Sequence, residues 1–188
     1  MFVKRFFDFF LAFLCLAIFA LPMAIISLAI KFSSRGDVIY WSDRVGRANA
    51  IFRMPKFRTM YIGAPVIATH LLSDSGQYLT LIGSFLRQSS LDELPQLWSI
   101  LIGNMSFVGP RPALFNQDDL IALRTQYGVD KLVPGLTGWA QVNGRDELSI
   151  PLKVQYEVEY LNKKCFWFDM KILGLTLLKV VRRAGVSH

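Results

Sequence analysis

Cysteine, histidine and charged residues are all scarce in this sequence. The chain of 188 residues has two cysteines and two histidines, and only 19% of its residues are charged. Cys15 and Cys165 are far apart, so their spacing fits neither a disulfide framework nor a metal-ligating motif. We therefore expect a reducing, cytosol-facing environment, and we assign no function to His70 or His188.

Acidic residues are also few, and internal repeats and low-complexity stretches are absent. Fourteen Asp and Glu stand against 21 Lys and Arg, which gives a net charge of +7. A basic balance favours anionic lipid, phosphorylated substrates or nucleic acid as partners, although a solvated basic surface has the same charge. No nucleic acid is expected, because the aromatic residues do not alternate with Lys and Arg along one groove. The length allows one domain with a sizeable core.

Apolar residues are in excess, since 53% of the chain is hydrophobic. A run without charged side chains extends from Phe9 to Ile30 and has basic residues on both sides. As a straight helix it would reach about 33 Å at about 1.5 Å per residue, which is enough to cross the hydrocarbon core of a membrane. A secretory signal peptide is disfavoured, because no small-x-small cleavage site precedes the polar region.

The flanks and the interior of this run favour a helix that enters the membrane and returns. A spanning helix is expected to have its basic residues mainly on one side, whereas this run has them at both ends. Pro22 removes a backbone donor and kinks or breaks the helix, and Ser27 is a candidate donor for a freed carbonyl. We predict a re-entrant helix-break-helix anchor over residues 1–35, with a kinked single span as the alternative.

The remainder, residues 36–188, predicts an α+β domain that is mostly helical. Alternation over residues 36–61 indicates short strands in a small hairpin, with turns at Ser42-Asp43 and Ala48-Asn49. Helical patterns follow over residues 82–101 (interrupted at Pro95), 116–127 and 151–162, and Gly- and Pro-rich loops over 62–80, 103–112 and 133–145.

A further amphipathic helix is predicted over residues 171–183. Its polar residues, among them Lys171, Thr176 and Lys179, fall on one arc of a helical wheel. That composition is typical of a helix lying in a membrane interface. A helix that packs its apolar face on a protein core has the same pattern, so both interpretations stay open.

Two adjacent acids, Asp92 and Glu93, have two interpretations. In the first, Ser90 is a helix N-cap and Glu93 completes a capping box. Pro95 opposes this, because a helix that begins at Leu91 needs an amide that proline lacks. We place Pro95 instead in the first turn of the following helix. The acids then lie at a turn near a helix amino end, where a phosphate also binds well.

Three groups of basic side chains could meet this acid pair. Arg111 stands between two prolines, on a rigid backbone suited to bidentate phosphate binding. Arg145 follows an Asn-Gly turn, and Lys56 and Arg58 form the third group. Cations that hold phosphates beside carboxylates for a metal ion and for attack are the elements of a phosphoryl-transfer site.

Several stretches resemble the bacterial sugar transferase family of monotopic phosphoglycosyl transferases, in its minimal catalytic form. In chain order they are Lys56-Phe-Arg-Thr-Met60, Ser90-Leu-Asp-Glu-Leu-Pro-Gln-Leu97, Gly103-Asn-Met-Ser-Phe-Val-Gly-Pro-Arg-Pro112, Pro134-Gly-Leu-Thr-Gly-Trp-Ala-Gln-Val-Asn-Gly-Arg145 and Asp169-Met-Lys-Ile172. The resemblance covers essentially the whole chain. It departs at Leu21, where the family commonly has a serine before the membrane proline.

The resemblance implies a reaction in two steps. Asp92 would attack the sugar-bearing phosphate of a UDP-sugar, releasing UMP and leaving an aspartyl phosphosugar. Undecaprenyl phosphate would then take the phosphosugar, which is the first membrane step of glycoconjugate or polysaccharide assembly. Asp92 and Glu93 would hold Mg²⁺, with Glu93 alternatively accepting the proton of the acceptor.

The resemblance also implies a substrate site and a location. Candidates for holding phosphates or the nucleotide are Lys56, Arg58, Arg87, Arg111 and Arg145. Trp139 is expected in the core. The location implied is the bacterial inner membrane, in contact with lipid and with the active site on the cytoplasmic face. Two rivals stay open: a membrane-bound glycosyl transferase that releases UDP, and a non-catalytic membrane-anchored scaffold. The sugar, the pathway and the oligomeric state are not specified.

Overall fold

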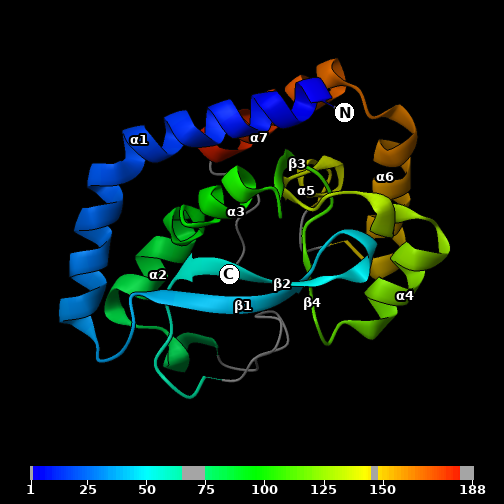
Figure 1. Cartoon of the computed structure of the whole chain (residues 1–188). Helices are drawn as coiled ribbons and strands as arrows, with labels where there is room; N and C mark the ends of the chain where they lie inside the picture. The colour runs from blue at the N-terminus through cyan, green and yellow to red at the C-terminus, as the bar shows by residue number, and fades with distance from the viewer. Residues whose placement is uncertain (1, 65–74, 145–147, 183–188) are drawn as a thin grey trace.

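The computed structural model describes residues 2–64, 75–144 and 148–182 of the chain (Figure 1). The α-helices are α1 (Phe2–Ser33), α2 (Leu81–Gln88), α3 (Gln96–Ile102), α4 (Asp118–Gln126), α5 (Trp139–Val142), α6 (Ile150–Lys163) and α7 (Phe166–Arg182). The strands are β1 (Ile39–Val45), β2 (Ile51–Phe57), β3 (Ser106–Val108), β4 (Ala113–Leu114) and β5 (Gly135–Thr137). The 3-10 turns are η1 (Arg47–Asn49), η3 (Ser75–Tyr78), η4 (Leu91–Glu93) and η5 (Val129–Lys131). The predicted α+β class with small sheets is confirmed.

Helix α1 is continuous from Phe2 to Ser33, and its axis bends along its course (Figure 1). Pro22 lies inside it, and proline is the usual cause of a sharp kink because its ring and missing amide disturb the preceding turn. The Ser27 hydroxyl donates to the carbonyl of Met23 at 2.7 Å. That carbonyl lies one turn before Ser27 and is not the one that Pro22 leaves without an amide, which belongs to Ile18.

The first turns of α1 are docked on the rest of the protein by charged side chains. Arg5 donates to the carbonyls of Ile100 and Leu101 at 2.6 and 2.7 Å, at the end of α3. Asp8 is buried and accepts from the amide of Phe107 at 3.2 Å. The charges before the apolar run therefore satisfy backbone groups of the domain instead of only facing solvent.

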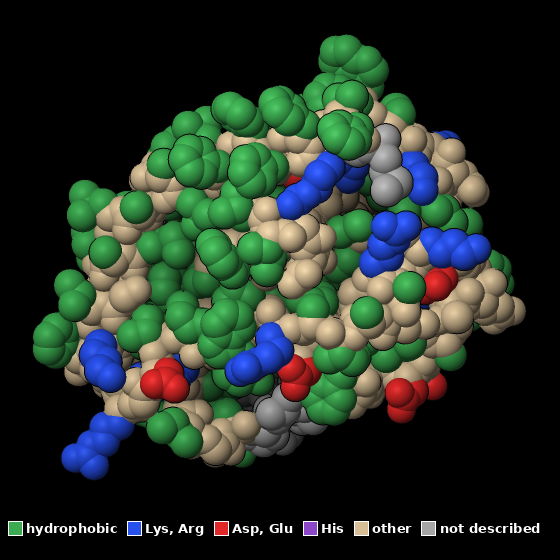
Figure 2. All heavy atoms as spheres, in the orientation of Figure 1, with side chains coloured by type: hydrophobic (Ala, Val, Ile, Leu, Met, Phe, Trp, Pro, Cys, Tyr) green, Lys and Arg blue, Asp and Glu red, His purple; other side chains and the backbone are tan. Residues whose placement is uncertain are grey.

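The outward face of α1 is almost wholly apolar. Figure 2 shows hydrophobic side chains covering much of the surface around it, while Lys, Arg, Asp and Glu gather toward the lower and right parts of the view. Only 6% of the residues in its most apolar 18-residue stretch are buried. Exposed apolar side chains of the neighbouring helices are Leu81 and Phe85 of α2 and Trp98 and Ile102 of α3. Within the described residues, α1 is the one helix long and apolar enough to cross a membrane.

The predicted hairpin is confirmed, with one correction. Strands β1 and β2 pair antiparallel, and β4 pairs with the other edge of β1, giving the order β2-β1-β4. The turn lies at Ala48-Asn49, where both φ angles are positive (54° and 59°). The turn predicted at Ser42-Asp43 is wrong: Ser42 lies inside β1, opposite Met54, with its side chain buried. A small polar side chain in a buried strand position looks like a turn signal in the sequence alone.

The helices over 116–127 and 151–162 are confirmed within two residues as α4 and α6. The pattern over 82–101 forms two helices, α2 and α3, separated by η4, so the interruption is wider than Pro95 alone. The two loops predicted over 103–112 and 133–145 contain β3 and β5, which pair in parallel. A strand of three residues is too short to show an alternating pattern in the sequence. These segments are recognised as strands only because they pair with each other.

Helix α7 begins before residue 171, at Phe166, and has two apolar faces. Ile172 and Asp169 are buried against the domain, and Thr176 is 2.7 Å from the Thr137 hydroxyl of β5. Trp167 and Leu177 are exposed, at 78% and 67%. The helix therefore packs on the core through one face, as the second interpretation expected, and exposes apolar side chains on another. Its position at a membrane interface stays a prediction.

Candidate active site

The two acids sit on a short, strained turn between α2 and α3. Asp92 and Glu93 lie in η4, and Ser90 before them adopts a left-handed backbone with φ 57°, which costs a non-glycine residue about 1–2 kcal/mol. The Ser90 side chain makes no capping hydrogen bond. The capping-box interpretation is therefore wrong, and α3 begins directly after Pro95.

Glu93 is held by two cations that come from distant parts of the sequence. Lys56 of β2 donates to Glu93 Oε1 at 2.9 Å, and Arg111 Nη2 lies 2.6 Å from the same oxygen. Arg111 Nη1 reaches Glu93 Oε2 at 3.5 Å. These charge-assisted contacts fix the carboxylate and join β2, η4 and the loop that carries Arg111.

Asp92 has a different environment from its neighbour. Its carboxylate is buried and lies 4.0 Å from the Lys56 ammonium, beyond hydrogen-bonding distance. One acid of the pair is thus saturated by cations, while the other is only attracted by them. A carboxylate with such loose partners keeps oxygen lone pairs available for a new bond.

The pKa values of the two carboxyl groups are moved in opposite directions. Burial raises the pKa of Asp92, and the attraction of Lys56 only partly offsets this effect. Burial acts in the same direction on Glu93, but Arg111 and Lys56 outweigh it and hold the pKa of Glu93 well below its usual value. A pair of acids with separated pKa values is typical of sites that divide two roles between them.

Lys56 and Arg87 complete the cation cluster around Asp92. Burial lowers the pKa of the Lys56 ammonium, although Glu93 opposes this shift. Arg87, from the last turn of α2, donates through Nε to the Thr59 hydroxyl at 3.0 Å and is attracted by Asp92. Lys56, Arg87 and Arg111 are therefore brought to the acid pair as expected from the sequence.

Arg58 is placed elsewhere. Its guanidinium donates to the carbonyls of Ser34 and Arg35 at 2.9 and 2.7 Å, just after the end of α1. Both terminal nitrogens are used for this contact, which satisfies backbone acceptors at a helix end. Arg145, the remaining predicted cation, lies outside the described residues.

One basic residue of the site escaped the sequence interpretation. Arg44 of β1 is electrostatically coupled to Arg111 and Glu93, and burial lowers its pKa to about 10. Tyr40 of β1 is paired with Lys56 of β2, and Arg44 is four residues after Tyr40 on the same strand. Arg44 and Lys56 therefore lie on the same face of the hairpin. Side chains two or four residues apart on a strand share a face. The alternation in the sequence could therefore have indicated that Arg44 lies on the face that carries Lys56.

Trp139 is half-buried and packs against the core, close to the expected position. Its indole nitrogen donates to Glu159 at 2.8 Å, and its ring packs 5.0 Å from the ring of Phe168, with the ammonium of Lys171 5.6 Å from its centroid. These contacts join α5, α6 and α7. They give the indole a structural role.

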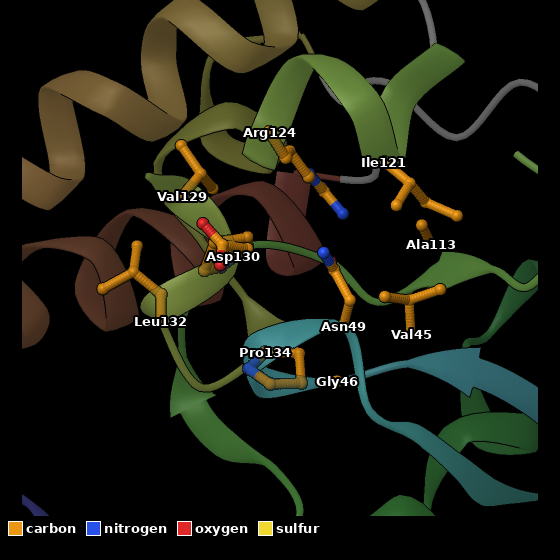
Figure 3. A pocket seen from close by; sticks show the side chains of 11 residues that line it. Val45, Gly46, Asn49, Ala113, Ile121, Arg124, Val129, Asp130, Leu132 and Pro134 are labelled. Carbon is orange, nitrogen blue, oxygen red and sulfur yellow. The ribbon is translucent and has the colours of Figure 1, made fainter. Parts of the chain in front are cut away.

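A small cavity of about 20 Å³ lies apart from the acid pair (Figure 3). Asn49, Arg124 and Asp130 are among the residues that line it, and none of the predicted site residues does. Arg124 is already bound by Glu157, with its Nε at 2.8 Å from Oε2. The volume suits about one water molecule, so the candidate site is the charged cluster and not this cavity.

The acid pair offers two carboxylates as candidate metal ligands. No group of three or more His, Cys, Asp or Glu side chains that could hold a metal ion occurs in the described residues. Mg²⁺ needs no such cage, since it commonly keeps several waters and binds one or two carboxylates together with substrate phosphates. Asp92 is buried and accepts no hydrogen bond from Lys56, whose ammonium is 4.0 Å away, so it fits that arrangement, and Glu93 lies beside it.

A mostly buried carboxylate pair with Lys and Arg around it, on a strained turn, is an arrangement found at sites that bind phosphate. The sequence model of the bacterial sugar transferase family matches residues 1–183. The chain belongs to this family.

Named relatives agree with this assignment. A UDP-glucose:undecaprenyl-phosphate glucose-1-phosphate transferase of Escherichia coli is 38% identical over 184 residues, 94% of this chain and 40% of the relative. An undecaprenyl-phosphate galactose phosphotransferase of Salmonella typhimurium is 33% identical, over 98% of this chain and 41% of the relative. An uncharacterized sugar transferase, EpsL, of Bacillus subtilis is 35% identical over all of this chain and 92% of its own length. The chain thus spans about two fifths of the length of the first two relatives.

Proposed function

We propose that the protein is a phosphoglycosyl transferase that moves a sugar phosphate from a UDP-sugar to undecaprenyl phosphate and releases UMP. The observation that carries the proposal is the contrast inside the acid pair: Glu93 is bound by Lys56 and Arg111, while Asp92 has no cation within hydrogen-bonding distance in the contacts above. The names of the relatives support the acceptor and the sugar-phosphate chemistry.

In the first step, a carboxylate oxygen of Asp92 forms a bond to the sugar-bearing phosphorus of the donor. The bond from that phosphorus to the oxygen bridging toward uridine breaks, and its electron pair leaves with UMP. Lys56, Arg87 and Arg111 would hold the phosphate oxygens and the developing charge. Burial raises the pKa of Asp92, while Lys56, Arg87 and a bound Mg²⁺ would favour the ionised carboxylate that attacks phosphorus.

In the second step, a phosphate oxygen of undecaprenyl phosphate attacks the same phosphorus. The bond from phosphorus to Asp92 breaks, which restores the carboxylate and releases the lipid diphosphate sugar. Glu93 would keep Lys56 and Arg111 in place through both steps, because its two oxygens engage both cations. A residue that positions cations contributes to the rate without forming a bond to substrate.

Mg²⁺ is part of the proposal. Asp92 would hold it, with Glu93 adjacent, and the ion would neutralise charge on the diphosphate and on the leaving UMP. The remaining charge is balanced by Lys56, Arg87 and Arg111, which are part of the fold before any substrate binds.

The same proposal places the protein at the inner membrane with its site on the cytoplasmic face. Helix α1 and the exposed apolar side chains of α2, α3 and α7 would enter the bilayer, since a polyprenyl acceptor cannot leave it. The bend of α1 supports a re-entrant helix (Figure 1). The apolar surface of α1, α2 and α3 and the exposed apolar face of α7 would together hold the domain at the membrane interface. A water-soluble donor can reach the site there.

The deciding experiment measures the released nucleotide. The full chain in membranes is given UDP-glucose, UDP-galactose or UDP-N-acetylglucosamine with Mg²⁺, with and without undecaprenyl phosphate. We expect acceptor-dependent UMP from at least one donor, a loss of more than about 10³-fold in Asp92→Asn, and wild-type turnover in the control Asp119→Asn, whose side chain is exposed on α4.

The alternatives give different results in the same assay. Release of UDP would identify a glycosyl transferase. Turnover that persists in Asp92→Asn would remove this residue as the nucleophile, and normal cellular function of that variant would support the scaffold. Intact mass of the wild type with donor alone should show an added sugar phosphate that Asp92→Asn lacks.

A further inference from the structure

We propose that Arg44 is a positioning residue: it holds the loop of residues 109–112 and thereby the guanidinium of Arg111 that meets Glu93. The inference deepens the proposed function and rests on it for its effect on catalysis. Arg44 belongs to none of the motifs that identify the family resemblance, and it would act through Arg111 without touching the reacting atoms.

The contacts of Arg44 lead directly to that loop. Its Nη1 donates to the carbonyl of Pro112 at 3.2 Å, and its Nε donates to the Ser42 hydroxyl at 3.0 Å. Ser42 is buried two residues earlier on β1, on the same face. The guanidinium is therefore held at one edge by its own strand while the other edge binds the residue next to Arg111.

The composition of the loop explains why such a contact is needed. Pro110 and Pro112 have no amide hydrogen, so the backbone groups of these two residues can form hydrogen bonds only through their carbonyls. The Pro110 carbonyl accepts from the amide of Gly135 at 2.8 Å, at the start of β5. The Pro112 carbonyl accepts from Arg44. One contact on each side of Arg111 thus limits where its side chain can point.

Regular strand pairing does not reach this part of the loop. The ladder between β1 and β4 pairs Val45 with Ala113 and Arg44 with Leu114, and it ends there. The Arg44 side chain extends the attachment of β1 by one residue, to Pro112. Without it, the Pro112 carbonyl would lose this partner, and the backbone between Arg111 and Ala113 would gain conformational entropy.

The groups around Arg44 favour arginine over lysine at this position. Arg44 is repelled by Arg111 and attracted by Glu93, so the carboxylate offsets the repulsion between the two guanidinium groups. Lysine would keep the charge at position 44, but its single nitrogen lacks the planar fork that serves Ser42 and Pro112 together. Retention of charge alone should therefore not restore the position of the loop.

The first test measures the loop itself and is independent of catalysis. Amide hydrogen exchange is followed by mass spectrometry on the full chain in detergent, for wild type, Arg44→Lys, Arg44→Gln and the control Arg53→Gln. Arg53 is exposed on the other strand of the hairpin, 5.3 Å from the Trp41 ring centroid. We expect peptides covering residues 106–114 to exchange at least about 10-fold faster in both Arg44 variants, with α6 unchanged and the control like wild type. Equal exchange in wild type and both variants would overturn the proposal.

The second test asks whether Arg44 acts through Arg111. In the transfer assay, Arg44→Gln should lower kcat/KM for the donor by about 10–100-fold, and Arg44→Lys should recover little of it. In an Arg111→Gln background the same change should have less than about a 3-fold effect, because coupled residues are not additive. An undiminished effect there would show that Arg44 acts independently and would overturn the proposal. If wild type transfers nothing from any donor, the proposed function fails, while the exchange result still decides whether Arg44 holds the loop.

Discussion

The ammonium of Lys4, in the first turn of α1, lies 2.6 Å from the carboxylate of Asp169 in α7. Tyr160 donates to the other Asp169 oxygen at 2.7 Å, and Lys4 also donates to the carbonyl of Val108 at 3.0 Å. This network is mostly buried, and it joins the apolar helix to β3, α6 and α7. Lys4 therefore has a structural partner in addition to any role at a membrane surface.

Replacing Lys4 by methionine should destabilise the fold by about 3 kcal/mol, because it leaves the buried Asp169 carboxylate with no neutralising charge. The measurement is chemical unfolding in detergent, followed by tryptophan fluorescence. Lys163→Met is the matched control: its partner Glu159 is on the surface of α6, where such a pair contributes about 0.5 kcal/mol or less. Equal losses in the two variants would contradict the structural role of Lys4.

Glu93→Gln should reduce stability at neutral pH by about 2 kcal/mol, because Lys56 and Arg111 lose their shared partner. The folded-state pKa of Glu93 is held well below the usual 4.5. Its contribution is thus present above pH 4.5 and is lost as the pH falls through the lower folded-state value. The difference between variant and wild type should shrink below pH 4.5 in unfolding measurements from pH 7 to pH 3. A constant difference would refute this assignment.

Asp92→Asn should have the opposite effect on stability at pH 7. Burial raises the folded-state pKa of Asp92 above 3.8, so its favourable contribution is complete below pH 3.8 and is lost as the pH rises through the folded-state value. At pH 7 the ionised carboxylate therefore opposes folding, and asparagine should raise the unfolding midpoint while abolishing transfer. Such a gain in stability is a known trade-off at catalytic positions, which is the role proposed for Asp92. A lower midpoint would show that Asp92 stabilises the fold as a charge.

The contrast between these two neighbours shows what the sequence could predict about the site. Asp92, Glu93 and Arg111 stand in motifs with a recognisable chemistry, and they meet as expected. The separate environments of the two acids depend on where Lys56 and Arg111 arrive from distant strands and loops. No local pattern contains that information, so the different surroundings of the two acids became visible only in three dimensions.

Arg58 and Arg44 also show what the sequence could not predict: Arg58 was expected in the site and lies elsewhere, whereas Arg44 was not expected and lies beside it. Both are basic residues near the hairpin, and the motif drew attention to Arg58. Strand β2 ends at Phe57, and the Arg58 side chain binds carbonyls just after α1. Strand alternation directs Arg44 toward the Arg111 loop. The hairpin and the longer helices were predictable from periodicity; β3 and β5 were not, because each is defined by its partner.

The topology of α1 can be tested by labelling two cysteines. In a chain with Cys15 and Cys165 replaced by serine, cysteine is placed at Phe2 or at Arg35. A membrane-impermeant maleimide should label both positions in inside-out vesicles and neither in sealed right-side-out cells. Labelling from opposite sides would establish a spanning helix and end the re-entrant proposal.

The strained turn before the acids gives a prediction about backbone conformation. Ser90 has φ 57°, a conformation that glycine adopts freely and that β-branched residues resist. Ser90→Gly should keep transfer activity and stability within about 1 kcal/mol, whereas Ser90→Val should destabilise by about 2 kcal/mol and reduce kcat. Unfolding midpoints and initial rates on the same preparations provide the comparison. Equal behaviour of the two variants would mean that the turn relaxes without loss.

Both ends of α1 are fastened to the same folded body. Arg5 and Lys4 attach its beginning to α3 and α7, and Arg58 attaches the residues after its end to β2. If α1 is embedded in a bilayer as proposed, a helix fastened in this way would not leave it while the rest of the protein stays intact. Under a pulling force applied to a bilayer-embedded molecule, extraction of the helix and rupture of the domain would therefore occur as one mechanical event, with a single peak in the force trace.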